Sequence, residues 1–241
     1  MAVSKGKIAD NLRRIREAVA AACARRRRKE ADVSIVAVTK SVGPETIDLL
    51  PGLGLTDLGE SRVQPLLDRA RRLRDRQAAG QAASAAPVRW HMIGHLQRNK
   101  VKALLPAVDV IHSVDSLRLA EDISLRAEAA GRPVDLLLQV NASEEPQKSG
   151  VAVGAAAHMS ELISTLPNVR LIGLMTMAPV VRDMEDARPT FVRIRELFEE
   201  MRHERLGGPA FRHLSMGMSQ DYPVAVEEGA TMLRIGTALF E

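Results

Sequence analysis

The sequence has few aromatic residues, one cysteine and no long apolar run, and each shortage excludes a class of protein. Phe, Trp and Tyr make up 2% of the 241 residues, so there is no ladder of aromatic side chains on which nucleic-acid bases could stack. Cys23 has no partner for an internal disulfide, which favours a reducing, cytoplasmic setting. Residues 1–10 lack a signal-peptide apolar region and nowhere do about 18 apolar residues run uninterrupted, so we expect neither secretion nor a membrane span.

The net charge of +4 could indicate a polyanionic partner. Much of the excess lies in two runs, residues 25–29 and 69–76, which are typical of solvated helix faces. A basic balance without a motif that reads a nucleic-acid groove is weak evidence for such binding. We therefore expect no nucleic-acid partner.

Eight short runs rich in β-branched residues alternate with helical patterns along the chain. An amphipathic pattern at Ile8, Leu12, Ile15 and Val19 first predicts a lead-in helix within residues 1–30. The runs that follow are 33–39, 55–59, 88–93, 108–112, 134–140, 169–174, 211–214 and 231–235. Each is followed by a polar or glycine corner and then by a helical pattern, such as residues 185–205. This alternation predicts parallel strands.

The number of these units predicts the fold. Hydrophobic residues make up 46% of the chain, enough for one large core, and no spare length remains for another domain. We therefore predict an α/β fold in which residues 1–241 form one domain, a single (β/α)8 TIM-type barrel with an extra N-terminal helix. An open doubly wound sheet is the alternative. Residues 80–87, rich in Ala, are expected to form a surface loop before the third strand.

Lys40 follows the first predicted strand, at the end of the barrel where active sites lie. Strand alternation puts Val36, Val38 and Lys40 on one face, so an inward Val38 would bring Lys40 to the barrel mouth. Among apolar neighbours its amine would lose solvation and become a neutral nucleophile for a carbonyl group. An exposed lysine at a strand end is the alternative.

Small and hydroxyl-bearing residues follow the seventh and eighth strands. Ser215, Gly217 and Ser219 precede a helix that is predicted to begin near residue 221, and Gly236 and Thr237 follow the last strand. Glycines let the backbone approach an anion, and a helix start offers unpaired N–H groups. An ordinary Gly/Ser loop with a helix cap would give the same pattern. Together with the lysine after the first strand, the pattern suggests a phosphorylated aldehyde as ligand.

Arg234 lies two residues before Gly236, so both face the same way on a strand. An inward guanidinium could meet a ring nitrogen or a phosphate. Beside the nitrogen of a pyridine ring, the guanidinium would keep that nitrogen unprotonated. A pyridine ring without that proton is a poor electron sink. A salt bridge with Glu60 or Asp221 is the alternative.

The histidines suggest hydrogen bonding rather than metal binding. His91 and His95 share one segment, but no third ligand stands at a spacing that makes a zinc motif, so no metal is predicted. His112 and Asn141 are expected to orient side chains around the barrel mouth.

Eight segments, in order along the chain, resemble one known family. They are residues 37–40, 59–60, 90–100, 111–115, 139–141 with Lys148 and Gly150, 173–175, 214–219 with Asp221, and 234–237. So many segments in the right order are far more specific than a single motif. The chain is similar to the pyridoxal phosphate homeostasis proteins (YggS-like), which are related to the N-terminal domain of alanine racemases.

The resemblance implies that Lys40 holds pyridoxal 5'-phosphate as a Schiff base and that Arg234 faces the pyridine nitrogen. It also implies that the phosphate is surrounded by Ser215, Ser219, Gly236 and Thr237. The predicted cofactor-binding residues are Lys40, Ser61, His91, Ser215, Met216, Ser219, Arg234, Gly236 and Thr237; no catalytic residue is predicted. The family usually has Asn-Tyr where this chain has Ser61 and Arg62, so an Asn contact near the ring is lost or replaced by the shorter Ser61.

The implied function is that of a monomeric carrier rather than a catalyst. Similar proteins keep the pool of pyridoxal phosphate in check inside the cell, and apo forms of pyridoxal-phosphate enzymes are the expected partners. A pyridoxal-phosphate-dependent amino-acid racemase of the alanine racemase type is the alternative, but it needs bases on both faces of the substrate carbon, and the racemase draws one from a second domain. A class I aldolase-like lyase is a third possibility, because a barrel lysine also forms imines with sugar phosphates.

Overall fold

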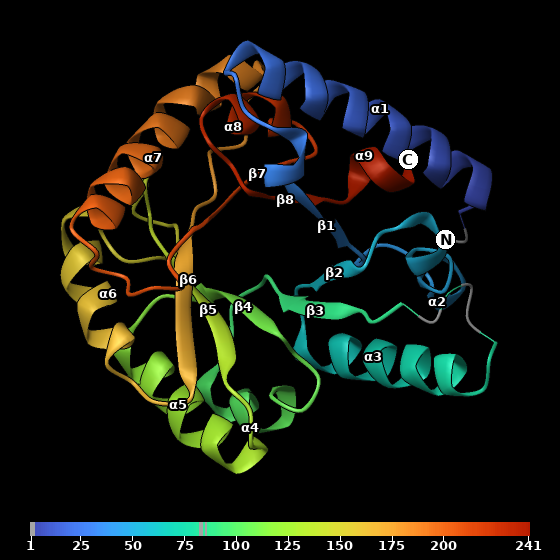
Figure 1. Ribbon diagram of the computed structural model, residues 1–241, viewed down its shortest axis with the longest axis horizontal. Coiled ribbons are helices and arrows are strands. Elements are labelled where there is room, and N and C mark those ends of the chain that lie inside the picture. The colour runs from blue at the N-terminus through green and yellow to red at the C-terminus, as the bar shows by residue number, and fades with distance from the viewer. Residues whose placement is uncertain (1–2, 82–83, 85) are drawn as a thin grey trace.

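A computed structural model describes residues 3–81, 84 and 86–241, and it contains eight parallel strands closed into a barrel (Figure 1). The strands are β1 (Ser34–Val38), β2 (Asp57–Glu60), β3 (Arg89–Met92), β4 (Val110–Val114), β5 (Val134–Gln139), β6 (Val169–Met175), β7 (His213–Met218) and β8 (Met232–Ile235). Each pairs with the next along the chain, and β8 returns to pair with β1. The predicted TIM-type barrel is confirmed, and the open sheet is wrong.

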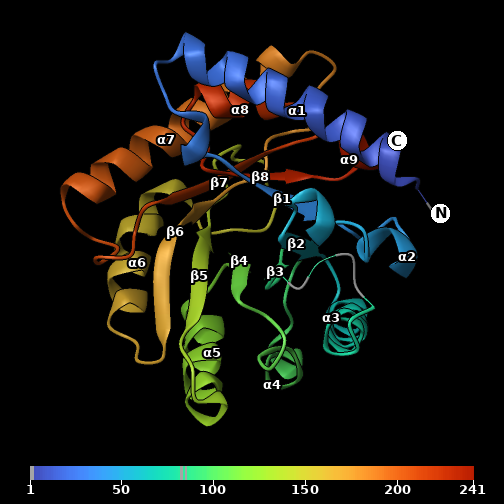
Figure 2. The same ribbon diagram turned by 45° about the vertical axis from the view of Figure 1, so that its right-hand side comes forward.

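Helices surround the barrel (Figures 1 and 2). They are α1 (Lys5–Arg25), α2 (Pro44–Ile47), α3 (Val63–Ala78), α4 (Val101–Leu104), α5 (Leu117–Ala130), α6 (Ala156–Ser164), α7 (Arg188–His203), α8 (Tyr222–Glu227) and α9 (Thr237–Phe240). Short 3-10 turns are η1 (Glu30–Asp32), η2 (Pro51–Leu53), η3 (Arg98–Lys100), η4 (Val153–Ala155) and η5 (Met184–Ala187). The extra helix α1 packs against α8 and α9, and its Asn11 Nδ2 donates to the Leu239 carbonyl across 3.1 Å.

Strand alternation separates two environments in the barrel wall. Side chains on the outer face, such as Ala37, Leu58 and Leu233, join the helices in the main hydrophobic core. Inside the barrel a small apolar cluster is formed by Val110, Leu137, Ile172, Met175 and Met232. Much of the remaining interior is polar, with buried histidine, serine and arginine side chains. Buried polar groups need hydrogen-bond partners, so these side chains must bond to one another.

The end of the seventh strand was wrongly predicted from the sequence. The predicted run ends at Leu214 and treats residues 215–219 as a corner, but β7 continues to Met218. Serine and glycine have low strand propensity, yet a barrel wall accepts them where space is limited. A Cβ on Gly217 would lie 2.6 Å from the Cβ of Ala225, so α8 packs directly on this part of the strand.

The other predicted strand ends fall within two residues of those observed. The predicted helix over 185–205 consists of the turn η5 followed by α7. The predicted loop over 80–87 includes residues 82, 83 and 85, which lie outside the described residues. No helix in the described part of the chain is long and apolar enough to cross a membrane.

Candidate functional site

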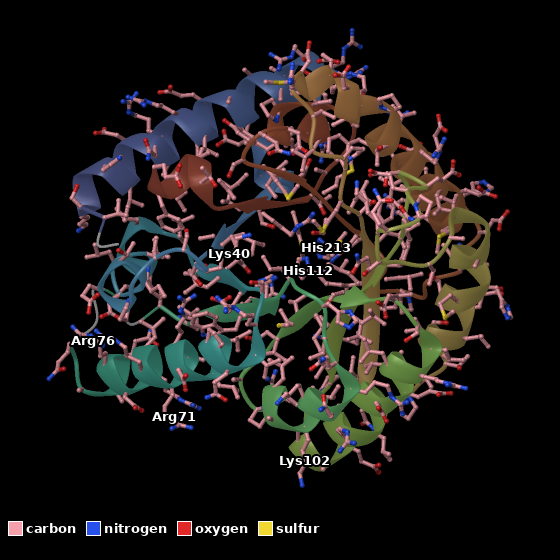
Figure 3. All side chains as sticks on the ribbon, turned by 180° about the vertical axis from the view of Figure 1, so that it is seen from behind. Lys40, Arg71, Arg76, Lys102, His112 and His213 are labelled. Atoms are coloured by element: carbon pink, nitrogen blue, oxygen red, sulfur yellow. The ribbon has the colours of Figure 1, made fainter. Side chains whose placement is uncertain are left out.

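Lys40 lies at the carboxyl end of β1, beside the seam where β1 and β8 close the barrel. A Cβ placed on Gly236, just after β8, would lie 3.4 Å from the Cβ of Val38 at the end of β1. Figure 3 shows Lys40 and His112 towards the middle of the molecule. Barrel closure therefore brings the lysine near the beginning of the chain to the glycine near its end.

The Lys40 side chain is exposed, so the expected burial among apolar neighbours is wrong. The inward alternation holds as far as Val38, which is 6% exposed, but the strand ends there and the chain turns at Lys40. An amine in this position is open to a carbonyl ligand that enters the mouth from solvent.

An ion pair holds the backbone on both sides of Lys40. The Arg69 guanidinium, from α3, donates to the Thr39 carbonyl across 2.9 Å and to the Val42 carbonyl across 3.1 Å. It also pairs with the Glu60 carboxylate at the end of β2, which is 1% exposed. The lysine turn is thereby attached to both the barrel wall and α3.

Arg69 was not among the predicted site residues, because it lies in a run of arginines that is typical of a solvated helix face. The spacing of Arg69 from its apolar neighbours nevertheless indicated a buried position. Arg69 follows Leu66 by three residues and lies within the apolar stripe that Leu66 forms with Ala70 and Leu73, all of them buried. An arginine within an apolar stripe needs a buried partner, and Glu60 is that partner.

Two backbone amides after β8 converge on one hydroxyl oxygen. Ser219 Oγ accepts the N–H of Gly236 across 3.2 Å and that of Ala238 across 3.1 Å. Thr237 lies between them and is exposed. Convergent backbone N–H groups are a common means of binding a phosphate oxygen. The structure thus brings Ser219, Gly236 and Thr237 together at the mouth.

Arg234 is buried inside the barrel, with 5% of its surface exposed. Its Nη1 donates to Ser215 Oγ across 2.6 Å and its Nη2 to the Thr176 carbonyl across 2.8 Å. Burial lowers its pKa to about 10, while the nearby Asp221 carboxylate acts in the opposite direction. Glu60 pairs with α3 instead, and none of the ion pairs among the described residues includes Arg234. The alternative of a salt bridge with Glu60 or Asp221 is therefore wrong.

Three other predicted contacts point elsewhere than the open mouth. The Ser215 hydroxyl is fully buried and already bonded inside the barrel. Met216 is fully buried in the core between barrel and helices, so its side chain faces outward. The Ser61 hydroxyl donates to Glu60 Oε1 across 3.3 Å.

His91 belongs to a hydrogen-bonded chain across the barrel interior, together with Asp57, His112 and Ser215. Asp57 Oδ1 lies 2.9 Å from His91 Nε2, His91 Nδ1 lies 2.8 Å from His112 Nε2, and His112 Nδ1 lies 3.0 Å from Ser215 Oγ. We name these four residues the interior chain. Both histidines are fully buried. The orienting role predicted for His112 agrees with these bonds.

Burial acts on the pKa of His112 and on that of Asp57 in opposite directions. It holds the pKa of His112 well below its ordinary value; the charge of Arg234, and a proton on His91 if one were present, act in the same direction. Burial tends to raise the pKa of Asp57, but the hydrogen bond from His91 and the positive charges around it leave that pKa lowered. Asp57 is therefore an ionised acceptor and His112 a neutral imidazole at neutral pH.

Other polar residues at this end of the barrel line a separate hollow. His95 Nδ1 lies 3.7 Å from Asp115, and Asn141 Nδ2 donates to the Glu145 carbonyl across 2.9 Å. His95, Asn141 and Lys148 help to line a cavity of about 310 Å³. Across the described ranges, no three or more His, Cys, Asp or Glu side chains are grouped so that they could hold a metal ion.

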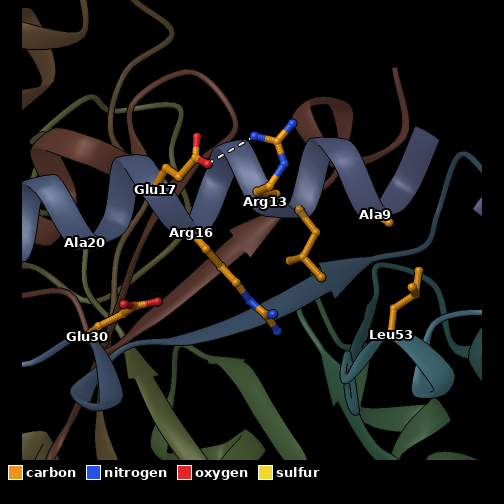
Figure 4. Close-up of a pocket in the computed structure, with 8 residues that line it drawn as sticks. Ala9, Arg13, Arg16, Glu17, Ala20, Glu30 and Leu53 are labelled. Atoms are coloured by element: carbon orange, nitrogen blue, oxygen red, sulfur yellow. Dashed lines mark hydrogen bonds and ion pairs between the residues drawn. The ribbon is translucent and has the colours of Figure 1, made fainter. Parts of the chain in front are cut away.

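A second hollow, of about 400 Å³, lies along α1 (Figure 4). Its lining includes Arg13 and Glu17, an exposed pair 3.1 Å apart on the helix, and Leu53 from η2. It contains none of the predicted cofactor-binding residues.

The groups at the mouth fit the cofactor that the resemblance implies. An aldehyde needs an amine, which Lys40 presents to solvent. A phosphate needs hydrogen-bond donors, and the amides of Gly236 and Ala238 would serve by exchanging Ser219 Oγ, their present acceptor, for a phosphate oxygen. A pyridine nitrogen needs one donor, and Arg234 uses two of its five N–H groups in the bonds given above.

Comparison with known proteins agrees with this geometry. The family described as alanine racemase, N-terminal domain, matches residues 3–241. A pyridoxal phosphate homeostasis protein of Aquifex aeolicus is 41% identical over 231 residues, which is 96% of each chain. The structure of PipY from Synechococcus elongatus PCC7942 with PLP bound is 30% identical, with a TM-score of 0.81, and the match covers 97% of this chain and 100% of that one.

A more distant likeness shows the fold alone. Alanine racemase of Clostridium difficile 630 is 16% identical with a TM-score of 0.69. The match covers 95% of this chain but 56% of the racemase chain.

Proposed function

The chain belongs to the family of pyridoxal phosphate homeostasis proteins, which share the alanine racemase N-terminal fold, and from this we propose that it binds pyridoxal 5'-phosphate as a Schiff base on Lys40. We propose that it acts in intracellular homeostasis of this cofactor and delivers it to apo forms of pyridoxal-phosphate enzymes. One observation carries the proposal: the exposed Lys40, the convergent amides of Gly236 and Ala238 and the buried Arg234 gather at the seam between β1 and β8.

Each group has a defined task in this proposal. The bound cofactor would supply an aldehyde, and the Lys40 amine would hold its carbon as a Schiff base, with one water molecule released. Ser219, Gly236 and Thr237 would hold the phosphate. Arg234 would donate to the ring nitrogen, and because it keeps its own proton the ring nitrogen stays unprotonated. This arrangement suits a protein that holds the cofactor better than one that stabilises a carbanion on it.

The racemase alternative receives less support. Racemisation needs acid–base groups on both faces of the substrate carbon. The likeness to alanine racemase, at 16% identity, shows the fold alone. We therefore propose a carrier that works as a monomeric barrel domain in the cytoplasm. Racemisation of alanine by the purified chain, abolished by Lys40→Ala, would favour the enzyme instead.

Borohydride trapping tests the covalent site. Wild type, Lys40→Ala and Lys102→Ala are incubated with pyridoxal 5'-phosphate, reduced and digested, and the labelled peptide is identified by mass spectrometry. Lys102 is an exposed lysine at the rim of the molecule in Figure 3 and serves as the matched control. We expect label on Lys40 in wild type and in Lys102→Ala, and none at that position in Lys40→Ala. Equal labelling of several lysines would contradict a dedicated site.

Delivery is tested separately. The loaded protein is mixed with the apo form of a pyridoxal-phosphate enzyme, and the recovery of that enzyme's activity is followed. We expect recovery with loaded wild type but not with Lys40→Ala carried through the same loading. A loaded protein that never yields cofactor would contradict delivery while leaving binding intact.

A further inference from the structure

The interior chain, Asp57, His91, His112 and Ser215, has one consistent proton arrangement when both histidines are neutral. The Asp57 carboxylate is ionised, so it can only accept, and His91 must donate to it through Nε2. A neutral imidazole carries one proton, so His91 Nδ1 is then an acceptor. It faces His112 Nε2 at 2.8 Å, which must donate.

The same rule fixes the serine at the far end. With its proton on Nε2, His112 has an acceptor at Nδ1, so the Ser215 hydroxyl must donate to it across 3.0 Å. The Ser215 oxygen is then free to accept from Arg234 Nη1 at 2.6 Å. Every link has one donor and one acceptor, from the carboxylate on β2 to the guanidinium on β8.

With a neutral His91, the reversed arrangement fails at the carboxylate. If His112 donated to Ser215 through Nδ1, His91 would have to donate to His112 through Nδ1. Its Nε2 lone pair would then face the ionised Asp57 oxygen at 2.9 Å, and two acceptors would repel each other without a proton between them. Asp57 therefore sets the direction of all the bonds that follow.

We propose that the interior chain is a positioning device for Arg234. Asp57 acts through the two histidines to keep Ser215 as an acceptor, and Ser215 together with the Thr176 carbonyl fixes the plane of the guanidinium. This inference rests on the proposed function, because positioning Arg234 matters only if Arg234 binds the ring nitrogen of the cofactor. It also changes the role of Ser215, from a phosphate contact to a positioning residue behind Arg234.

The geometry explains why Arg234 needs such a device. An arginine side chain has several rotatable bonds, and no carboxylate among the described residues pairs with this one. Two neutral acceptors hold it instead, Ser215 Oγ and the Thr176 carbonyl. If Ser215 donated its proton to the ligand, it would no longer bond to His112, and the link to Asp57 would be broken.

Nitrogen NMR of the ligand-free protein tests the proton arrangement. The whole protein has six histidines, so a ¹⁵N-histidine-labelled sample gives few signals, and each can be assigned by comparison with a single-site variant. At neutral pH we expect His91 and His112 each to show a protonated Nε2 and an unprotonated Nδ1. A proton on Nδ1 of either ring, or two protons on either ring, would overturn the inference.

Cofactor affinity tests the positioning role. His112→Asn keeps an amide oxygen near the place of Nδ1, where it can accept from Ser215, whereas His112→Leu keeps no acceptor. The matched control is His213→Asn on β7, since His213 lies outside the interior chain and contacts Thr231 Oγ1 at 3.4 Å. We expect the Kd for pyridoxal 5'-phosphate to rise about tenfold in His112→Leu and less than about threefold in His112→Asn and His213→Asn.

Outcomes for the two proposals are separable. If wild type forms no adduct with pyridoxal 5'-phosphate, the proposed function fails, while the NMR result still decides the proton arrangement. If wild type binds but His112→Leu and His112→Asn bind equally well, the positioning role is overturned. If His112→Leu does not fold, Ser215→Ala replaces it in the test. This smaller change removes the hydroxyl that accepts from Arg234, and we expect it to show the tenfold loss of cofactor affinity. Wild-type affinity in Ser215→Ala would also overturn the role.

Discussion

The Arg69 guanidinium donates to the carbonyl oxygen of Thr39, the residue that precedes Lys40, across 2.9 Å. A second donor of the same group reaches the Val42 carbonyl across 3.1 Å, so the turn that carries Lys40 is held on both sides. The charge is balanced by Glu60, which is 1% exposed. One buried ion pair therefore serves both the stability of the barrel and the placement of the proposed cofactor lysine.

Arg69→Ala is expected to lower the free energy of unfolding by about 3–5 kcal/mol, because it leaves the Glu60 carboxylate buried without its partner. Urea denaturation measures this loss. The double variant Arg69→Ala/Glu60→Gln should recover part of it, since the uncompensated charge is gone. Both variants should react more slowly with pyridoxal 5'-phosphate than wild type, because neither fixes the Lys40 turn.

A neighbouring arginine provides the control. Arg72 lies on the same helix, 41% exposed, and pairs with Asp48 across 3.3 Å. Arg72→Ala should cost less than about 1 kcal/mol and leave the reaction of Lys40 unchanged. Equal losses in Arg69→Ala and Arg72→Ala would show that the carbonyl bonds to Thr39 and Val42 have no special importance.

Ser219→Asp is expected to separate phosphate binding from ring binding. The new carboxylate would lie at the amides of Gly236 and Ala238 and would repel a phosphate there. Like charges about 4 Å apart near a protein surface repel by about 4 kcal/mol, so affinity for pyridoxal 5'-phosphate should fall at least about 100-fold. Affinity for pyridoxal, which has no phosphate, should change less than about threefold.

The neutral variant Ser219→Asn controls for size, and it should weaken the phosphorylated ligand much less. Titrations with both ligands, followed by absorption, give the four affinities. An equal loss for pyridoxal and its phosphate would mean general damage to the mouth, and no loss for either would place the phosphate elsewhere.

The barrel could be predicted from the sequence because each of its strands carries β-branched or bulky apolar residues on at least one face. The second half of β7 shows the limit. The residues after Leu214 alternate between a buried serine and a buried methionine, with Gly217 next, and such a run has weak strand propensity. Packing of α8 on Gly217 and pairing with β6 and β8 keep it in the sheet, and neither is visible in a local pattern.

The site could be predicted only where a residue follows a strand. Lys40, Ser219 and Gly236 do, and the structure brings them to one end of the barrel. Asp57 opens its strand instead of following it, and its hydrogen bond to His91 depends on the alignment of two neighbouring strands. Which of the candidate hydroxyls is already bonded, as that of Ser215 is, could be learned only from the folded chain.

Acid should weaken the fold through His112. Burial holds its folded-state pKa well below the ordinary 6.5, so below about pH 6.5 the unfolded chain binds a proton that the folded chain does not. The free energy of unfolding must therefore fall as the pH drops, with a slope that approaches about 1.4 kcal/mol per pH unit from this group. His213, whose pKa is also lowered by burial, adds a contribution of the same sign.

Urea denaturation between about pH 7 and pH 5 measures the slope. His112→Asn should show a smaller slope than wild type, because the titrating group is absent. The lowered pKa of Asp57 acts in a separate window: its contribution is present above the ordinary carboxyl pKa and is lost as the pH falls below about 4. Identical slopes in wild type and His112→Asn would contradict a buried neutral imidazole.

Gly173→Ala should disrupt both the barrel and the site. Gly173 lies in β6 opposite His213 of β7, and a Cβ on it would lie 1.7 Å from the His213 carbonyl oxygen. No rotamer relieves a contact with backbone, so β6 and β7 must separate, and we expect a loss of more than about 4 kcal/mol. Because β7 carries Ser215, any Gly173→Ala protein that still folds should also bind pyridoxal 5'-phosphate more weakly.

Gly154→Ala is the control, because a Cβ on Gly154 would meet nothing within 4 Å. This variant should match wild type in urea denaturation and in cofactor titration. If the two alanine variants behaved alike, the close approach of β6 to β7 at Gly173 would not be a requirement of the fold.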